Sequence, residues 1–591
     1  MTAVRQFTRP LVGSSASTII IFTPLAFLSG VTGAFFRALS LTMAASLVIS
    51  FFVAWLAVPI LANHFLKASD LEASEDGPWT RRAHALYERL MRAVFRDPRR
   101  LLLVIAALVG LGVTGFALTG SGFMPSMDEG GFVLNYRAAP GTSLTETARL
   151  LDKVQKILRA DHNIRTYSLR TGLQLGGGIT GTNEGDFFVL LKSYPRPSVW
   201  RIMAHVRRAI HARVPGLKIS MDQPMQDLIG DLTGAPQPVE IKVFSGNGPL
   251  LRRLGPAIAA RLRRIRGIVN VRDGIVYAGD AVEIRVNRAK AALEGVNPQS
   301  VTRQLSAYLN GTVATDVQRG VRMIGVRVWV PRPMRRSLHA IRDLRLRAAN
   351  GHLFPLRAVA VVRRLNGQPE IARDNLKRMI PITARIAGRS LGGVMHDVKR
   401  LMARRNFLPP GVYATLGGVY VQQQIAFAGL MAVFAAAVAL VFLLLLFLYE
   451  RFLVTFALMA TTLLALSAVF VGLWVTGTEL NISSMMGMTM VVGIVTEVAI
   501  FYYSEYQDVG EGDIVERLIA AGKNRLRPIA MTTLAAILAL LPLASGWGQG
   551  SAMQQPLAIA IISGLLVQLP LALVALPLFL SWGIRHRSSE S

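Results

Sequence analysis

The chain has 591 residues, 52% of them hydrophobic, and a mean hydropathy of +0.41. This composition excludes a soluble globular protein and indicates an integral membrane protein. The formal charge of +30 and the pI near 11.2 would favour a nucleic-acid partner in a soluble protein. Because the arginine clusters lack interleaved aromatic residues, a solvated basic face is the better interpretation. The absence of cysteine excludes disulfides and thiolate metal sites.

Eight apolar runs approach the roughly 20 residues that a helix needs to cross a bilayer. They lie at 12–30, 38–62, 101–119, 425–448, 453–475, 484–504, 528–546 and 556–583. Cations concentrate in the connector at 67–100, in the loop before the seventh span and at the C-terminus. The positive-inside tendency places these three parts in the cytoplasm, and the long polar segment at 120–424 therefore lies on the outer side.

The polar segment reads as alternating strands and amphipathic helices. Its first set is a strand at 131–138, a helix at 144–159, a strand at 185–192 and a helix at 198–214. Its second set is a strand at 238–244, a helix at 248–265, a strand at 281–286, a helix at 297–309 and strands near 322–330. Repeated βαβ units of this kind predict ferredoxin-like subdomains packed side by side.

The two ends of the chain repeat each other at one offset. Arg9-Pro10 recurs as Arg527-Pro528, a spacing of 527 − 9 = 518, and Pro24-Leu25-Ala26 recurs at the same spacing as Pro542-Leu543-Ala544. Each copy is a basic-Pro start, an apolar span, a Gly-containing turn and a second span, as in a membrane protein built from two related halves. Because so little chain precedes the first copy, we expect the first half to lack its front.

Four motifs carry a resemblance to a known family. They are Phe123-Met124-Pro125 with Asp128-Glu129-Gly130, then Ala139-Pro140-Gly141-Thr142-Ser143-Leu144, then Gly417-Gly418 with Gln422-Gln423-Gln424, and finally Arg525-Leu526-Arg527-Pro528-Ile529 with Met531-Thr532. On these motifs the chain resembles the resistance-nodulation-division (RND) efflux permeases, the inner-membrane subunits of proton-driven exporters in Gram-negative bacteria. The match covers essentially the whole chain, but only the part of a family member from its fifth transmembrane helix to its twelfth.

The resemblance implies a membrane α-helical bundle of about eight transmembrane helices with a large α/β periplasmic domain. That domain would hold ferredoxin-like βαβ porter subdomains and a docking subdomain. The expected divisions are a transmembrane hairpin at 1–66, a cytoplasmic basic amphipathic connector at 67–100, a transmembrane helix at 101–119, the periplasmic porter and docking domain at 120–424, a five-helix transmembrane bundle at 425–583 and a cytoplasmic tail at 584–591. The resemblance also implies a homotrimer, a periplasmic adaptor, an outer-membrane channel and no cofactor.

Glu497 is the strongest candidate for proton transfer. It lies within the sixth apolar run, where a charge costs about 3 kcal/mol on insertion scales, so its carboxyl group can hold and release a proton near neutral pH. The alternative is a structural carboxyl group that hydrogen-bonds a neighbouring helix or reaches towards Tyr502 and Glu505. In the drug-exporting branch the resemblance puts a lysine at this position, whereas the heavy-metal branch has an acid nearby.

Arg525 and Thr532 match family positions connected to the proton relay. Their spacing of seven residues puts them on one face of a helix that extends back to Arg525. Arg525 is alternatively an ordinary basic residue at a helix end, and Thr532 an ordinary contact between helices. Residues 10–62 contain no Asp, Glu or Lys. The paired aspartates of the family relay therefore have no counterpart in this chain.

The exported substrate is less well indicated than the transport class. Met124, Met127, Met221 and Met225 lie in the polar segment, and thioethers can carry soft ions such as Cu(I). Methionine is more often a filler of apolar gaps, so Met221 and Met225 are only weak metal candidates. The sequence contains no metal-binding His pair, nucleophile elbow or Walker lysine, so it gives no indication of an enzyme.

Two functions remain open from the sequence. The preferred one is the C-terminal part of a proton-driven RND transporter of the bacterial inner membrane, exporting heavy-metal ions or hydrophobic compounds. Its first partner is the missing N-terminal half of the permease, if that half is separately encoded. The alternative is a non-transporting fragment or regulatory subunit that associates with intact RND pumps.

Overall fold

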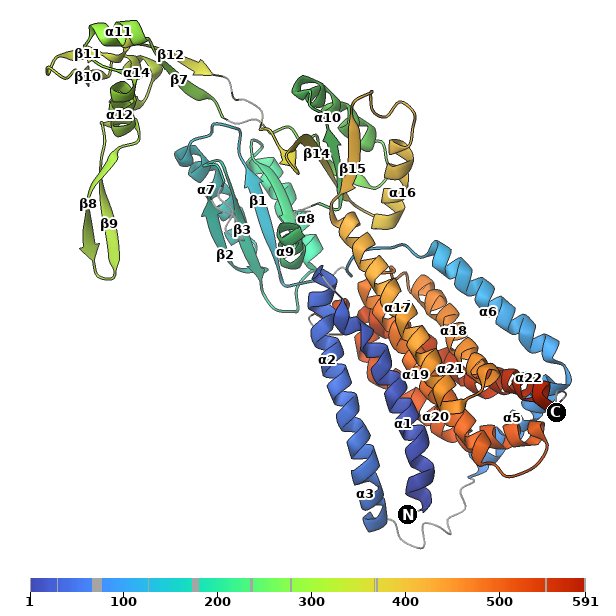
Figure 1. Cartoon of the computed structure of the whole chain (residues 1–591). Helices are drawn as coiled ribbons and strands as arrows, with labels where there is room; N and C mark the ends of the chain where they lie inside the picture. The colour runs from blue at the N-terminus through green and yellow to red at the C-terminus, as the bar shows by residue number, and fades with distance from the viewer. Residues whose placement is uncertain are drawn as a thin grey trace.

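The computed structural model describes residues 2–28, 30–65, 77–125, 127–172, 180–233, 237–276, 279–365, 367, 370–547 and 550–588. A helix bundle forms one end of the molecule and α/β units form the other (Figure 1). The bundle helices are α1 Thr2–Phe22, α2 Gly30–Phe52, α3 Val58–Phe65, α6 Pro98–Leu118, α17 Val419–Tyr449, α18 Phe452–Val475, α19 Ile482–Asp508, α20 Ile514–Ala544, α21 Gln555–Pro570 and α22 Leu576–Ser588.

Within the described residues, seven helical stretches are long and apolar enough to cross a membrane. The first expected span, 12–30, corresponds to a shorter apolar stretch, Leu11–Phe27. Its helix α1 ends at Phe22, and a short 3-10 turn at Pro24–Phe27 follows because Pro24 has no backbone N–H to continue the helix. The connector at 67–100 contains helix α5 Pro78–Arg96, while its part at 67–76 lies outside the described residues.

The two repeats fold alike, down to an irregular turn. A π-helical turn at Val53–Ala57 joins α2 to α3, and another at Leu571–Ala575 joins α21 to α22. Their spacing is 571 − 53 = 518, the offset of the sequence repeat. Pro59 and Pro577 follow the turns at the same offset. The structure therefore gives both copies the same hairpin of two helices with the same local defect.

Pro577 explains one contact of the second hairpin. A proline inside a helix has no N–H for the carbonyl four residues before it, here Leu573. The Tyr87 hydroxyl of α5 donates to that Leu573 carbonyl at 2.9 Å. Since a buried carbonyl without a partner is costly, this bond fixes α5 against the bundle.

Glycines set how closely α6 approaches the bundle. Gly112 and Gly115 are its only buried residues in the described structure, and both face α18. A Cβ atom at Gly112 would lie 2.7 Å from the Ser467 Cα atom, and one at Gly115 would lie 2.9 Å from the Phe470 carbonyl oxygen. These positions admit only a hydrogen atom, because Cβ contacts with backbone at that distance do not occur.

We expect Gly112→Val to displace α6 from α18 and to lower the free energy of unfolding by about 1–3 kcal/mol, as overpacking does. Gly110→Val is the matched control, because a Cβ atom there meets nothing within 4 Å. The measurement is the thermal unfolding midpoint of both variants in detergent. Equal midpoints for the two variants would contradict this account of the helix contact.

The first α/β unit is one four-stranded sheet with two helices. Its elements are β1 Gly131–Arg137, α7 Leu144–Ala160, β2 Ile164–Thr171, β3 Glu184–Leu191, α8 Val199–Arg213 and β4 Lys218–Asp222. The strand order is β2-β3-β1-β4, and all pairs are antiparallel, with Val133 opposite Phe188. Alternate residues of the strands, such as Phe132 and Phe187, pack with Leu151 and Val206 from the two helices.

The second α/β unit has the same order but is interrupted. Strands β5 Val239–Phe244, β6 Ile268–Arg272, β14 Lys377–Ile386 and β15 Tyr413–Gly417 form one sheet with helices α10 Gly248–Leu262 and α16 Leu391–Met402. β5 lies between β14 and β15, and β6 pairs with the other edge of β14. Both units are therefore split βαβ folds, and the second one has a long insertion between β6 and β14.

The insertion forms a separate small unit that projects away from the two sheets (Figure 1). Its core packs β7 Ala281–Val286, α12 Pro298–Leu309 and β12 Ala360–Leu365, and its hairpin consists of β8 Thr312–Arg319 and β9 Arg322–Val328. The second predicted set of strands and helices is therefore divided between the second sheet and the insertion. The strand at 281–286 pairs with β12 rather than with β5, so it belongs to the insertion. The first-set helices and strands were predicted within one or two residues, whereas β2 and β4 were missed.

Candidate functional site

Helix α19 lies at the centre of the bundle. It contacts α1, α17, α18, α20 and α21. Its N-terminus is fixed by a capping box, in which the Asn481 side chain accepts from the Ser484 amide at 3.0 Å and the Ser484 hydroxyl accepts from the Asn481 amide at 2.8 Å. A helix that is surrounded by other helices is expected to be apolar on most of its faces. Most residues of α19 are indeed buried.

One face of α19 is open. Met490, Ile494, Glu497, Phe501 and Ser504 are all partly exposed, at spacings of four, three, four and three residues. These spacings put the five side chains in a single row along the helix. We call this row the α19 stripe. Between Ile482 and Tyr506, the other described residues of α19 are buried, apart from two that border the stripe.

The stripe runs between the two repeat-related helices. On one side Gly493 lies against α1, where its Cβ position is 3.1 Å from the Ile21 side chain. On the other side the Arg525 guanidinium of α20 lies over the Phe501 ring, 5.6 Å from its centroid. The flanks of the stripe are thus α1 and α20, which are the first helices of the two copies of the repeat.

Glu497 lies in the middle of this stripe. Its carboxylate makes no hydrogen bond or ion pair with any residue that the structure describes. The adjacent Thr496 is buried, and its hydroxyl is satisfied by the Val492 carbonyl at 2.7 Å and by Thr462 at 3.3 Å. An acid at membrane depth with no neutralising partner is costly when ionised, so it favours taking up a proton. Tyr502, a proposed structural partner, is fully buried and donates instead to the Leu518 carbonyl at 2.7 Å.

Arg525 pairs with a different acid. Helix α20 extends back past Arg525, as expected, and the guanidinium forms an ion pair with Glu505 at 2.8 Å. Asn524 donates to the same carboxylate at 2.8 Å. The Arg525 Nε atom is buried and has no hydrogen-bond acceptor among the described residues. Glu505 and Asn524 were not identified as site residues. Glu505 lies about two helical turns beyond Glu497, but its pairing with Arg525 depends on packing and leaves no signal in the sequence.

Thr532 lies on α20 and is exposed on the bundle surface. Its hydroxyl donates to the Pro528 and Ile529 carbonyls, both at 3.1 Å. The Pro528 contact is the ordinary back-bond of a helical threonine to the residue four positions earlier. Arg525 and Thr532 are therefore on one helix, but the structure joins neither of them to Glu497 by a hydrogen bond or an ion pair.

Three of the four methionine candidates lie in two separate cores. Met221 is buried within the first α/β unit, on β4. Met124 and Met225 pack against another cluster, beside Phe123 and Ile229. Among the described residues, no group of three or more His, Asp or Glu side chains is arranged to hold a metal ion. These positions act as apolar packing, which is the commoner use of methionine.

The motif at 128–130 fastens the start of β1 to the start of α8. The Asp128 carboxylate accepts from Arg196 at 2.6 and 2.9 Å, from the Tyr194 hydroxyl at 2.9 Å and from the Val199 amide at 2.9 Å. Burial by itself would raise the pKa of Asp128, but these donors outweigh it and hold the pKa well below its usual range. The motif therefore has a structural role in this chain.

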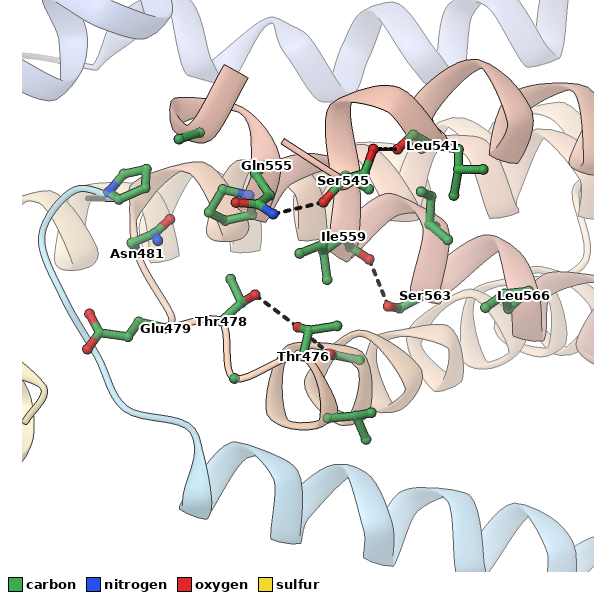
Figure 2. A pocket seen from close by; sticks show the side chains of 18 residues that line it. Thr476, Thr478, Glu479, Asn481, Leu541, Ser545, Gln555, Ile559, Ser563 and Leu566 are labelled. Atoms are coloured by element: carbon green, nitrogen blue, oxygen red, sulfur yellow. Dashed lines mark hydrogen bonds between the residues drawn. The ribbon is translucent and has the colours of Figure 1, made fainter. Parts of the chain in front are cut away.

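A cavity of about 1010 Å³ lies among the bundle helices, and Figure 2 shows the side chains that line it. It lies between the C-terminal ends of α18 and α20 and the N-terminal half of α21. Hydroxyl groups of Thr476, Thr478, Ser545 and Ser563 and apolar side chains such as Leu541 line it. Glu479 is the only charged residue in the lining, and burial raises the pKa of its carboxyl group. One carboxylate among hydroxyls and aliphatic groups suits an organic molecule better than a metal ion.

Comparison with known proteins places the whole arrangement in one family. The model of the AcrB/AcrD/AcrF family matches residues 1–582. The chain is 26% identical over 604 residues to the cobalt-zinc-cadmium resistance protein CzcA of Cupriavidus metallidurans, covering 100% of this chain and 56% of that protein. It is also 26% identical over 591 residues to the multidrug resistance protein MdtF of Escherichia coli K12, covering 97% of this chain and 57% of that protein.

Solved structures agree with the sequence relatives. The crystal structure of a heavy metal efflux pump, crystal form I, superimposes with a TM-score of 0.82 at 25% identity, covering 98% of this chain and 58% of that one. The chain thus spans little more than half the length of the relatives that it matches. The family match and the shared fold lead to one conclusion: the chain belongs to the AcrB/AcrD/AcrF family and corresponds to the C-terminal portion of an RND permease.

Proposed function

We propose that the chain is the C-terminal part of a proton-driven RND efflux transporter, a secondary active transporter rather than an enzyme. The observation that carries this proposal is the α19 stripe, where a carboxyl group with no partner among the described residues lies within an apolar span, on the open face of the central helix. A group that is neutral when protonated and costly when ionised can couple proton movement to a change in helix packing.

Glu497, Arg525 and Thr532 form the proposed proton relay, and it is incomplete in this chain. The α19 stripe is apolar except for Glu497 and Ser504, and its flanks are the repeat-related helices α1 and α20. A helix from the N-terminal half of the permease fits this position and would bring the partner acids that residues 10–62 lack. That half is the first partner that the proposal requires.

The remaining architecture is assigned by the same proposal. The bundle lies in the bacterial inner membrane, with residues 67–100 and the tail at 584–591 in the cytoplasm. The two split βαβ units are the porter subdomains, and the insertion at 279–365 is the docking subdomain, both in the periplasm. The working assembly is a homotrimer with a periplasmic adaptor and an outer-membrane channel.

The proposed substrates are heavy-metal ions or hydrophobic compounds. CzcA is named for cobalt, zinc and cadmium resistance and MdtF for multidrug resistance, and the chain is equally identical to both. The acid at Glu497 supports metal export, whereas the hydroxyl- and aliphatic-lined cavity beside α21 supports organic compounds. Export from the periplasm or the inner membrane fits either class.

Reconstitution tests the proposal. Proteoliposomes with an imposed pH gradient are prepared with this chain alone and with this chain plus an N-terminal half, and export of Co²⁺, Zn²⁺, Cd²⁺ and a lipophilic dye is measured. We expect export only from the pair, because the chain alone lacks the partner acids. Proton-coupled export by the chain alone would refute the missing-half requirement. Co-purification with an intact RND pump without any export by the pair would favour the regulatory alternative.

A further inference from the structure

Helix α5 Pro78–Arg96 lies at the end of the bundle opposite the α/β units (Figure 1). Only Asp97 separates it from α6, which begins at Pro98 and is long and apolar enough to cross a membrane. The start of α6 therefore fixes α5 at the surface of the bilayer, whichever direction it follows along that surface.

One row of α5 holds it against the bundle. Tyr87, Met91 and Val94 are buried, and the Tyr87 hydroxyl donates to the Leu573 carbonyl at 2.9 Å. Gly522 of α20 lies beneath the Tyr87 ring, because a Cβ atom there would be 1.9 Å from the Tyr87 hydroxyl oxygen. Glu88 forms an ion pair with Lys523 of the same helix. This row leaves the other two faces of α5 free of the bundle.

The second face is an apolar row. The side chains of Trp79, Leu86 and Leu90 are 79%, 70% and 47% exposed, and Ala93 continues the row. The spacings of seven, four and three residues align them along the helix. Exposed aromatic and aliphatic groups in one row of an otherwise charged helix mark an interaction surface.

The third face is a basic row. Arg82, Arg89 and Arg96 follow one another at seven-residue spacing, and all three are exposed. None of them forms an ion pair with a residue in the described ranges, whereas Arg92 is paired with Glu88 at 2.8 Å. Glu88, the only acid of α5, lies on the bundle side. The basic row is therefore uncompensated by any acid of its own helix.

We propose that α5 is an interfacial helix that binds acidic phospholipid headgroups. The apolar row enters the acyl boundary of the cytoplasmic leaflet, and the basic row contacts the headgroup phosphates. A helix with separate apolar and arginine rows has this preference, since acyl chains take up the first and anionic headgroups attract the second. A lipid leaflet also supplies both chemistries at the height that α6 sets, without a further protein.

Lipid binding to α5 would act on α20, because the two helices are in direct contact. Glu88, which lies between Leu86 and Arg89 in the sequence, forms an ion pair with Lys523, and Tyr87 packs on Gly522. Lys523 lies two residues before Arg525, which faces the α19 stripe. Acidic lipid therefore stabilises one position of α20 through α5. The headgroup surface itself does not depend on the proton site and is tested separately from it.

The test uses the full chain in vesicles, and the absence of native cysteine makes single labels possible. A spin label is placed at Ala93→Cys on the apolar row or at Ala85→Cys beside the basic row, both exposed positions. In vesicles of phosphatidylcholine with phosphatidylglycerol, we expect the Ala93 label to collide mainly with oxygen dissolved in lipid and the Ala85 label mainly with a water-soluble nickel chelate. Shielding of the Ala93 label from both reagents would mean that protein covers α5 and would overturn the proposal.

Headgroup specificity is read from the Ala85 label. Its mobility is expected to fall when phosphatidylglycerol replaces part of the phosphatidylcholine, and the R82Q/R89Q/R96Q variant is expected to lose this response. The matched control is R252Q/R253Q/R264Q, which removes three exposed arginines from the α/β region and keeps the response. An unchanged response in R82Q/R89Q/R96Q, or no response in the unmodified basic row, would overturn the proposal.

Discussion

Glu497→Gln is expected to reduce proton-coupled export by the complete transporter to the level of vesicles without a pH gradient. Glutamine keeps the size and the hydrogen-bonding capacity of the side chain but cannot take up a proton. Because the carboxyl group has no partner among the described residues, its replacement breaks no ion pair. The effect therefore isolates proton uptake from packing. The measurement is substrate export by the pair of halves in proteoliposomes.

Two comparisons make this result interpretable. Ser504→Ala alters the same stripe without removing a titratable group, so it is expected to leave export unchanged. Co-purification of the two halves is expected to be equal for Glu497→Gln and the unmodified chain. Undiminished export by Glu497→Gln would assign the residue to structure. Lost co-purification would assign it to assembly.

Asp128→Ala is expected to give the largest loss of stability. Asp128 is bonded to Arg196, whose side chain is only 2% exposed, so the substitution leaves a buried guanidinium without its counter-ion. Breaking a buried pair in this way costs about 3–5 kcal/mol. The substitution also removes the carboxylate that accepts from the Val199 amide, so the hydrogen bond between the start of β1 and the start of α8 is lost. Thermal unfolding of the first α/β unit measures the loss.

An exposed ion pair provides the control. The Glu146 carboxylate and the Arg149 guanidinium lie 2.7 Å apart, and their side chains are 44% and 60% exposed. Because exposed ion pairs contribute little to stability, Glu146→Ala is expected to leave the unfolding midpoint unchanged. Acid provides a second measurement, because the pKa of Asp128 is depressed in the folded chain. A depressed folded pKa gives stability that is present above the unfolded value of roughly 4 and is lost as the pH falls below it. Asp128→Ala should remove this acid sensitivity, and an unaltered pH profile would contradict its role.

Local patterns predicted the elements of the fold better than their partners. The run at 281–286 alternates as a strand should, and it is one, with bounds as predicted. Its partner is β12, far along the chain, and no local pattern specifies that pairing. Strand β2 was missed for another reason: polar residues lie on both of its faces, Arg165 on one and Ser168 and Arg170 on the other, so no apolar face stands out in sequence.

The candidate site divides in the same way. The cost of an acid within an apolar run singled out Glu497 from sequence alone. The open stripe around it depends on which of its neighbours are covered, and this is a property of packing. The pairing of Arg525 with Glu505 could not be predicted either, because it requires the angle between α19 and α20.

The matching π-helical turns give each hairpin one place where its length can change. A π-helical turn accommodates one residue more than an α-helical turn, so deleting one residue from 571–575 would let the chain close as a continuous α-helix. The later residues of α22 would keep the faces that they now present, because the deletion removes only the residue that the wider turn accommodates. A one-residue deletion placed after the turn has no such compensation and would rotate every later residue by about 100° around the helix axis. Leu580, now fully buried, would then leave its buried position, so a deletion at 577–579 should destabilise the bundle more than a deletion within 571–575.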